Sequence, residues 1–129
     1  MPVSYDLFRL LKWTESSVFE RPDGIKVTRV DAEFQYEGDL EGSTNLGYLM
    51  YYQADGTGTY SGWEQFSGTF RGKTATGVLS HQGTFDAKAV RCRVTCVPGT
   101  GTGALESVVL EFEAELLGHG PYPIELRVK

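Results

Sequence analysis

The chain has 129 residues, with 16 glycines, 12% aromatic residues and a formal net charge of −5. A chain of this length forms one core, so residues 1–129 are expected to be a single domain. The acidic balance argues against nucleic-acid binding, which needs clustered Lys and Arg. No apolar run approaches the ~20 residues that cross a bilayer, and Met1 to Asp6 lacks the basic and apolar regions of a signal peptide. We therefore expect a cytoplasmic protein with no nucleic-acid or membrane partner.

Strand-like runs separated by glycine-containing turns recur along the chain, and no stretch of ten residues has the apolar spacing of an amphipathic helix. The expected strands are Val3–Trp13, Ile25–Tyr36, Ser43–Gln53, Gly58–Thr69, Lys73–Gln82, Ala87–Val97, Leu105–Leu117 and Tyr122–Val128. Turns such as Arg21–Gly24, Ala54–Gly56 and Phe70–Gly72 suit tight hairpins. Eight consecutive antiparallel strands leave two exposed edges unless the first meets the last. The pattern therefore predicts an all-β, eight-stranded, antiparallel up-and-down barrel.

Strict alternation assigns the faces of the last three strands. The residues expected inside are Val90, Cys92, Val94, Cys96, Val108, Leu110, Phe112, Ala114, Leu116, Tyr122, Ile124, Leu126 and Val128. Arg91 and Arg93 then lie outside, where they can pair across strands with glutamates. Cys92 and Cys96 are about 13 Å apart along an extended strand, which excludes a disulfide between them. Two buried, reduced thiols are expected.

Two of the earlier strands depart from simple alternation. The second strand changes phase between Val27 and Val30, which predicts a bulge near Arg29. The third strand is apolar on both faces, with Tyr48 and Met50 on one and Leu49 and Tyr51 on the other. Because the chain has no helix to cover the second face, we expect another copy of the protein to do so. The sequence thus predicts a homo-oligomer.

Several turn motifs resemble those of a known group of proteins. These are Gly38–Gly42, Phe70–Gly72, His81–Phe85, Val97–Gly103 and Gly118–Pro121. They are similar to those of uncharacterised bacterial proteins that have the allene oxide cyclase fold. The resemblance implies an eight-stranded barrel of the calycin type with an apolar interior, assembled into a homo-oligomer. Allene oxide cyclase itself holds a fatty-acid epoxide in its cavity and steers its ring closure.

The resemblance supplies no catalytic residue. The cyclase uses a carboxylate near its first strand, and neither Asp6 nor Glu15 can be matched to it. Glu64 is the candidate acid or base from the residues themselves, because a carboxyl in an apolar cavity would be suited to proton transfer. The pattern does not decide which face of its strand points inward, so an exposed Glu64 at the surface or rim is the alternative interpretation.

Two histidines complete the candidate chemistry. His81 shares a face with Ala75 and Leu79, and inside a barrel it could shuttle a proton or hydrogen-bond a ligand carbonyl. A structural role for His81 is the alternative. His119 precedes Gly120 and Pro121, which places it in a turn. No spacing of His, Cys and carboxylates provides three convergent ligands, so neither a metal site nor a cofactor is expected.

The leading hypothesis is a barrel that binds a small, largely apolar molecule. The candidate catalytic residues are Glu64 and His81. We expect six further residues to line the ligand site: Tyr48, Met50, Tyr52, Trp63, Phe112 and Tyr122. Two alternatives stay open. One is a cyclase or isomerase that folds its substrate and uses one acidic group. The other is a structural homo-oligomer whose barrel is filled by side chains.

Overall fold

The computed structural model describes residues 2–118 and 120–129, and within these ranges the chain forms nine β-strands. The strands are β1 (Val3–Glu20), β2 (Lys26–Glu37), β3 (Leu40–Tyr52), β4 (Gly58–Phe70), β5 (Lys73–Phe85), β6 (Ala89–Cys96), β7 (Thr102–Gly103), β8 (Leu110–Leu117) and β9 (Tyr122–Val128). The prediction for His119 lies outside the described residues.

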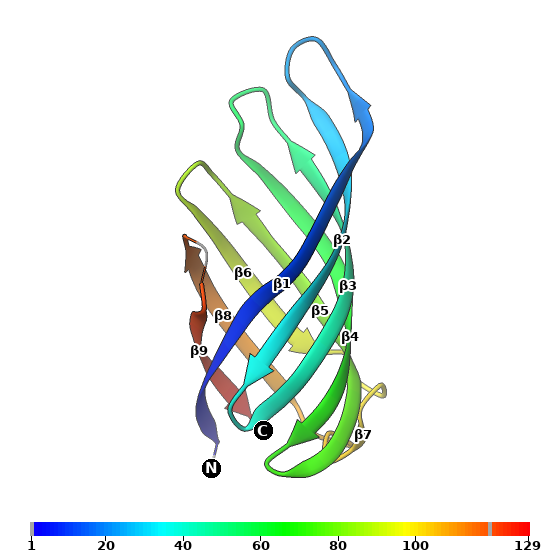
Figure 1. The fold of residues 1–129 in the computed structure, drawn as a ribbon, viewed down its shortest axis with the longest axis vertical. Coiled ribbons are helices and arrows are strands. Elements are labelled where there is room, and N and C mark those ends of the chain that lie inside the picture. Colours follow the sequence, from blue (N-terminus) through cyan, green and yellow to red (C-terminus); the bar gives the residue numbers. More distant parts are fainter. Residues whose placement is uncertain (1, 119) are drawn as a thin grey trace.

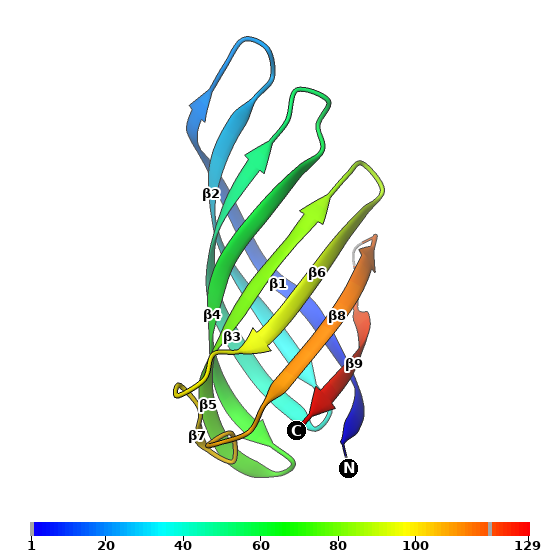
Figure 2. The same ribbon diagram turned by 180° about the vertical axis from the view of Figure 1, so that it is seen from behind.

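Eight of these strands close into an antiparallel barrel. Each consecutive pair from β1 to β6 is hydrogen-bonded, β6 pairs with β8, and β9 pairs with both β8 and β1. The two-residue β7 lies beside β5. Figures 1 and 2 show the ring from opposite sides, with both chain termini at one end and the hairpin turns β1–β2, β3–β4 and β5–β6 at the other. The predicted eight-stranded barrel is confirmed.

The strand boundaries differ most from the predicted ones at two places, the end of β1 and the start of β8. β1 continues past Trp13 to Glu20, paired with β2 all the way. The seventh predicted strand begins at Leu110, because the backbone N–H of Val108 donates to the carbonyl of Leu105 and closes a turn there. Leu105 is nevertheless buried beneath that turn.

The predicted bulge near Arg29 is wrong. The β2–β3 ladder runs without a register shift, while β1 carries two shifts, at Leu11 and at Val18. The phase of β2 is kept because Thr28, a polar residue, occupies an interior position, and Val27 points outward. The apolar pattern therefore assigned Val27 and Thr28 to the wrong faces of the sheet.

The interior is closely filled at the end of the barrel where the chain begins and ends. Phe8 stacks on Tyr36 with ring centroids 5.6 Å apart and meets Phe112 at 5.9 Å. Phe66 contacts the edge of Tyr36, and Leu110 is fully buried nearby in the same cluster. Such aromatic side chains bury large areas and dominate core energetics. Packed aromatic rings therefore occupy the interior at this end of the barrel.

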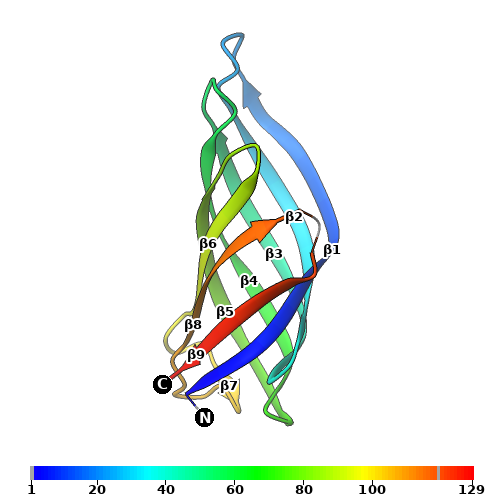
Figure 3. The same ribbon diagram turned by 90° about the vertical axis from the view of Figure 1, so that its left-hand side faces the viewer.

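The barrel wall is less complete toward the hairpin end. Going round from β1–β2 to β8–β9, the hairpins reach successively less far from the termini (Figures 1 and 3). As a result β1 pairs with β9 only through Val3–Phe8, and residues 9–20 pair with β2 alone. β8 and β9 pair only where Leu110 meets Val128 and Glu111 meets Arg127. The staggered strands leave an unpaired seam beside β1.

The two cysteines are free and buried, with both side chains inside the barrel, as expected. Burial raises the pKa of the Cys92 thiol to about 12, and it raises the pKa of the Cys96 thiol as well. The thiolate is the reactive form of cysteine, so both groups are poor nucleophiles in the folded protein. Covalent chemistry at these residues is therefore unfavourable.

None of the residues that the structure describes belongs to a helix long and apolar enough to cross a membrane.

Candidate functional site

A buried carboxylate lies at the centre of the barrel. Glu64 points inward from the middle of β4 and is fully inaccessible to solvent. The hydroxyl of Tyr36 on β2 donates to Glu64 Oε1 at 3.1 Å, and that of Thr44 on β3 donates to the same oxygen at 2.9 Å. His81 Nδ1 on β5 lies 2.6 Å from Glu64 Oε2. Four strands therefore supply one polar network, which satisfies a carboxylate that would otherwise be costly to bury.

His81 connects this carboxylate to two tyrosines. The Tyr48 hydroxyl lies 2.7 Å from His81 Nδ1 and 3.4 Å from Nε2, and the Tyr60 hydroxyl lies 3.0 Å from Nε2. An ionised carboxylate can only accept hydrogen bonds, so the ring proton on Nδ1 is the one that Glu64 fixes. Nε2 is then free to accept from Tyr60. The arrangement orients the imidazole as a carboxylate–histidine pair does in many enzymes.

The tyrosine hydroxyls stay protonated. Burial and the nearby Glu64 raise the pKa of Tyr36 and Tyr48 well above its ordinary value. The pKa of Tyr60 is also raised, by burial and by the neighbouring Cys92 and Glu64. Each group is therefore a hydroxyl at neutral pH and offers an O–H donor.

Two glycines make room for the tyrosine rings. A Cβ at Gly62 would lie 2.7 Å from Tyr48 Cδ1 and 1.9 Å from the Gly47 carbonyl oxygen. At Gly83, a Cβ would lie 3.0 Å from the Tyr60 hydroxyl. Any larger residue at these strand positions would displace the rings from His81.

A cavity of about 120 Å³ lies next to His81, at the hairpin end of the barrel. Its lining residues are Leu10, Trp13, Phe34, Tyr48, Met50, Tyr60, His81, Val90, Leu116, Gly118 and Tyr122. Most of these side chains are apolar, and the polar groups of Tyr48, Tyr60 and His81 come from three neighbouring strands. The cavity adjoins the unpaired seam, because its wall includes Leu10 of β1 and Tyr122 of β9.

The sequence-predicted residues fall into three groups. His81, Tyr48, Met50 and Tyr122 line the cavity, and Glu64 lies behind His81 without reaching it. Tyr52 and Phe112 face the interior but lie outside the cavity wall. Trp63 lies on the outer face of β4 with 61% of its surface exposed, so its prediction as a residue that lines the interior is wrong. Period-two alternation forces this result once Glu64 points inward.

The sequence also contained a signal that was not used. The tight turn at Arg71 and Gly72 pairs Phe70 with Lys73, and this register brings Gly62 opposite His81. Because Glu64 lies two residues from Gly62 on the same face, the hairpin makes Glu64 and His81 diagonal neighbours. Turn geometry could therefore have joined the two candidates before the structure was known.

A second polar cluster above the cavity was missed. Glu15 accepts hydrogen bonds from Thr28 at 2.6 Å, from Trp13 Nε1 at 3.2 Å and from Tyr52. Partial burial raises its pKa, but these hydrogen bonds and Lys26 outweigh burial and hold the pKa below the ordinary value. The cluster fixes Trp13 at the rim of the cavity. Glu15 lies beyond the predicted end of the first strand, so its partners could not be named.

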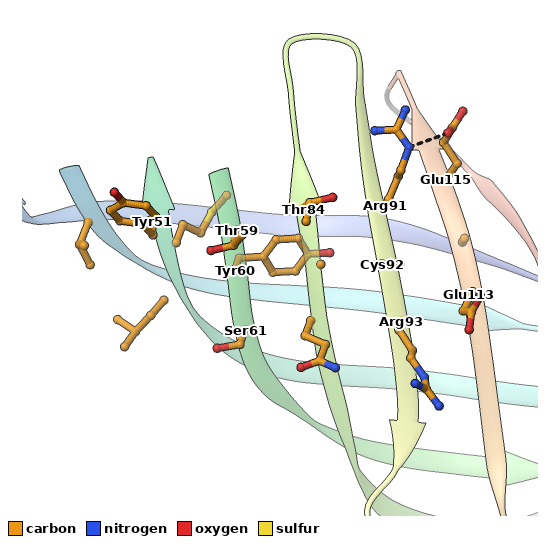
Figure 4. A pocket seen from close by; sticks show the side chains of 16 residues that line it. Tyr51, Thr59, Tyr60, Ser61, Thr84, Arg91, Cys92, Arg93, Glu113 and Glu115 are labelled. Carbon is orange, nitrogen blue, oxygen red and sulfur yellow. Dashed lines mark hydrogen bonds and ion pairs between the residues drawn. The ribbon is translucent and has the colours of Figure 1, made fainter. Parts of the chain in front are cut away.

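The outer face of the sheet is hollowed over β3 to β8 (Figure 4). This groove measures about 1040 Å³, and Tyr51, Thr59 and Ser61 line one side of it. On the other side Arg91 Nε lies 3.0 Å from Glu115, which confirms the predicted cross-strand ion pairing. Leu49, 54% exposed, and Tyr51 form an uncovered apolar patch here. Self-association through this patch stays a prediction.

No three His, Cys, Asp or Glu side chains gather into a possible metal site among residues 2–118 and 120–129.

Comparisons with known proteins agree on the fold. The model of a family described as "Protein of unknown function (DUF3224)" matches residues 7–127. A crystal structure of a protein of unknown function from the same family, from Shewanella oneidensis MR-1, superposes with a TM-score of 0.82. The two sequences are 22% identical, and the match covers 98% of this chain and 95% of the other. No curated protein matches.

The buried network predicts a large stability difference between two conservative substitutions. Glu64→Gln replaces one acceptor oxygen with an NH₂ group that faces hydroxyl or N–H donors, so it should destabilise the fold by about 1–3 kcal/mol. Glu41→Gln makes the same change at an exposed position and should cost less than about 0.5 kcal/mol. Urea unfolding of both variants measures the difference. Equal costs would show that Glu64 does not depend on its three donors.

Proposed function

The chain belongs to the DUF3224 family of proteins of unknown function, and on this premise we propose that its barrel binds a small, largely apolar molecule in the cavity beside His81. One observation carries the proposal. The cavity has a mostly apolar wall, and its hydroxyl and imidazole groups converge from β3, β4 and β5. Pockets for small molecules have this composition: apolar walls for affinity and a few placed polar groups for orientation.

The volume limits the size of the ligand. A dry cavity of about 150 Å³ accepts benzene, so a cavity of about 120 Å³ suits a single ring or a short branched chain. A longer molecule would have to extend out of the cavity through the unpaired seam beside β1. The half-exposed Trp13 and the glycine of the β8–β9 turn, Gly118, lie along that route.

The packing of the barrel supports binding over a purely structural role. The half of the barrel near the termini is filled by aromatic side chains, those of Phe8, Tyr36, Phe66 and Phe112. Side chains of this chain can therefore fill the interior of the barrel, and the cavity at the other end is not a requirement of the fold. At the hairpin end, the wall residues leave the cavity beside polar groups. Natural cores leave few voids larger than a water molecule, since voids are destabilising.

A pair of adjacent leucines provides the test. Leu116 lines the cavity, whereas Leu117 lies on the outer face with 59% of its surface exposed. Leu116→Trp should fill the cavity and abolish the binding of toluene, a probe of suitable size, while Leu117→Trp should leave the Kd within about twofold. Ligand-observed NMR measures both. The proposal would be contradicted if toluene did not bind the wild-type protein, or if it bound Leu116→Trp and Leu117→Trp with equal affinity.

Catalysis of proton transfer is the second candidate, and the contact between His81 and Glu64 favours it. Such a reaction is one form of the isomerase alternative that the sequence leaves open beside ligand binding. His81 Nε2 would take a proton from the carbon next to a ligand carbonyl, and a tyrosine hydroxyl would donate to the resulting enolate oxygen. Glu64 would stabilise the imidazolium through Nδ1–H and would act as a positioning residue. Return of the proton to carbon restores His81.

Hydrogen–deuterium exchange on a simple ketone tests this candidate. In D₂O, the protein should accelerate deuterium incorporation next to the carbonyl of cyclohexanone, by about 10²–10⁴-fold if His81 acts as the general base. His81→Gln should abolish the acceleration, and Gln82→Ala, on the outer face, should retain it. Proton NMR follows the exchange. Saturating cyclohexanone that exchanges no faster than in buffer would contradict proton transfer and leave binding as the function.

A further inference from the structure

We infer that the ligand carries a neutral hydrogen-bond acceptor, such as the carbonyl oxygen of a ketone, aldehyde or ester, because the polar end of the cavity holds one more hydroxyl hydrogen than it holds strong acceptors. The inference rests on the proposed binding function and names the chemical class of the ligand. It follows from counting donors and acceptors around His81.

Glu64 takes its hydrogen bonds from groups other than the two tyrosines beside His81, Tyr48 and Tyr60. Its Oε1 receives the hydroxyls of Tyr36 and Thr44, and its Oε2 receives His81 Nδ1. All three donors lie within the barrel core and all three are buried. The carboxylate is therefore the common acceptor of the network, and neither of the described tyrosines Tyr48 and Tyr60 makes a hydrogen bond to it.

The imidazole can accept at most one hydroxyl hydrogen. With Nδ1–H directed at Glu64, only Nε2 has a lone pair, and the nearer hydroxyl is that of Tyr60 at 3.0 Å. The Tyr48 oxygen lies 2.7 Å from Nδ1, which carries a proton and cannot accept, and 3.4 Å from Nε2, so the Tyr48 hydrogen then has no strong partner. A doubly protonated ring would accept from neither tyrosine. In each state at least one hydroxyl hydrogen is left over.

Neighbouring groups do not absorb this hydrogen. The sulfur of Cys92 lies within hydrogen-bond reach of Tyr60, but sulfur is a weak acceptor. Trp13 Nε1 is a donor only and is directed at Glu15. The Tyr122 hydroxyl donates to the Gly118 carbonyl at 2.7 Å, and among the described residues it makes no hydrogen bond with Tyr48 or Tyr60. The surplus hydrogen is thus on Tyr48 or Tyr60, both of which line the cavity.

Charge excludes two other ligand classes. No lysine or arginine is among the residues that line the cavity, and the carboxylate of Glu64 lies directly behind His81, so an anion would be repelled without compensation. An ammonium group brings only donors and cannot accept from a hydroxyl. A neutral acceptor satisfies the tyrosine and adds no buried charge.

Two molecules of the same shape test the inference. Cyclohexanone and methylenecyclohexane differ only in C=O against C=CH₂, so the ketone should bind about threefold to tenfold more tightly, the usual net value of one hydrogen bond. Tyr48→Phe and Tyr60→Phe should each remove the preference, because each leaves a single hydroxyl hydrogen for the Nε2 lone pair. In Tyr60→Phe, the Tyr48 hydroxyl no longer competes with Tyr60 and has only to close its 3.4 Å separation from Nε2. Tyr122→Phe, whose hydroxyl is engaged elsewhere, should retain it. Calorimetry or ligand-observed NMR gives the affinities.

The possible outcomes separate the inference from the proposed function. Equal affinity for the two probes, or tighter binding of cyclohexylammonium, would overturn the inference while binding in the cavity stands. A ketone preference that persists in both tyrosine variants would also overturn it, and if one variant fails to fold, the other decides. If neither probe binds, or if Leu116→Trp leaves their binding unchanged, the proposed function itself is contradicted.

Discussion

A single buried carboxylate organises this barrel. Glu64 has no access to solvent, and its two oxygens are held by hydroxyls from β2 and β3 and by an imidazole from β5. A charge removed from water is tolerated only when such partners surround it, so the four strands must keep one register for the network to survive. The same constraint turns His81 toward the cavity and gives the apolar interior its polar end.

The staggered strands explain why one half of the barrel is filled and the other is hollow. Near the termini, the ring is complete and aromatic side chains close on one another around Phe8. Toward the hairpins, residues 9–20 of β1 have no partner on the side away from β2. The cavity lies at this transition, with Leu10 and Tyr122 in its wall and the Glu64 network beneath it.

The sequence predicted the fold well where one face of a strand is clearly apolar. β6, β8 and β9 alternate, so their interior residues, including Cys92 and Phe112, were assigned correctly. In β4 both faces mix small, aromatic and polar residues, and alternation could not decide whether Glu64 or Trp63 points inward. The long extension of β1 was also missed, because its residues are exposed on both faces and carry no periodic signal. Sequence periodicity indicates the face of a strand on which a residue lies, but it does not indicate which side chains from different strands meet.

The proton on His81 tests the central claim most directly, since the network requires Nδ1–H to face Glu64 and leaves Nε2 as the acceptor. Long-range proton–nitrogen NMR on ¹⁵N-labelled protein at pH 7 distinguishes the two ring nitrogens, and His119→Gln assigns the signals. We predict one stable tautomer with a protonated Nδ1 and an Nε2 shifted by a hydrogen bond. An unprotonated Nδ1, or averaging between the two tautomers, would contradict the account.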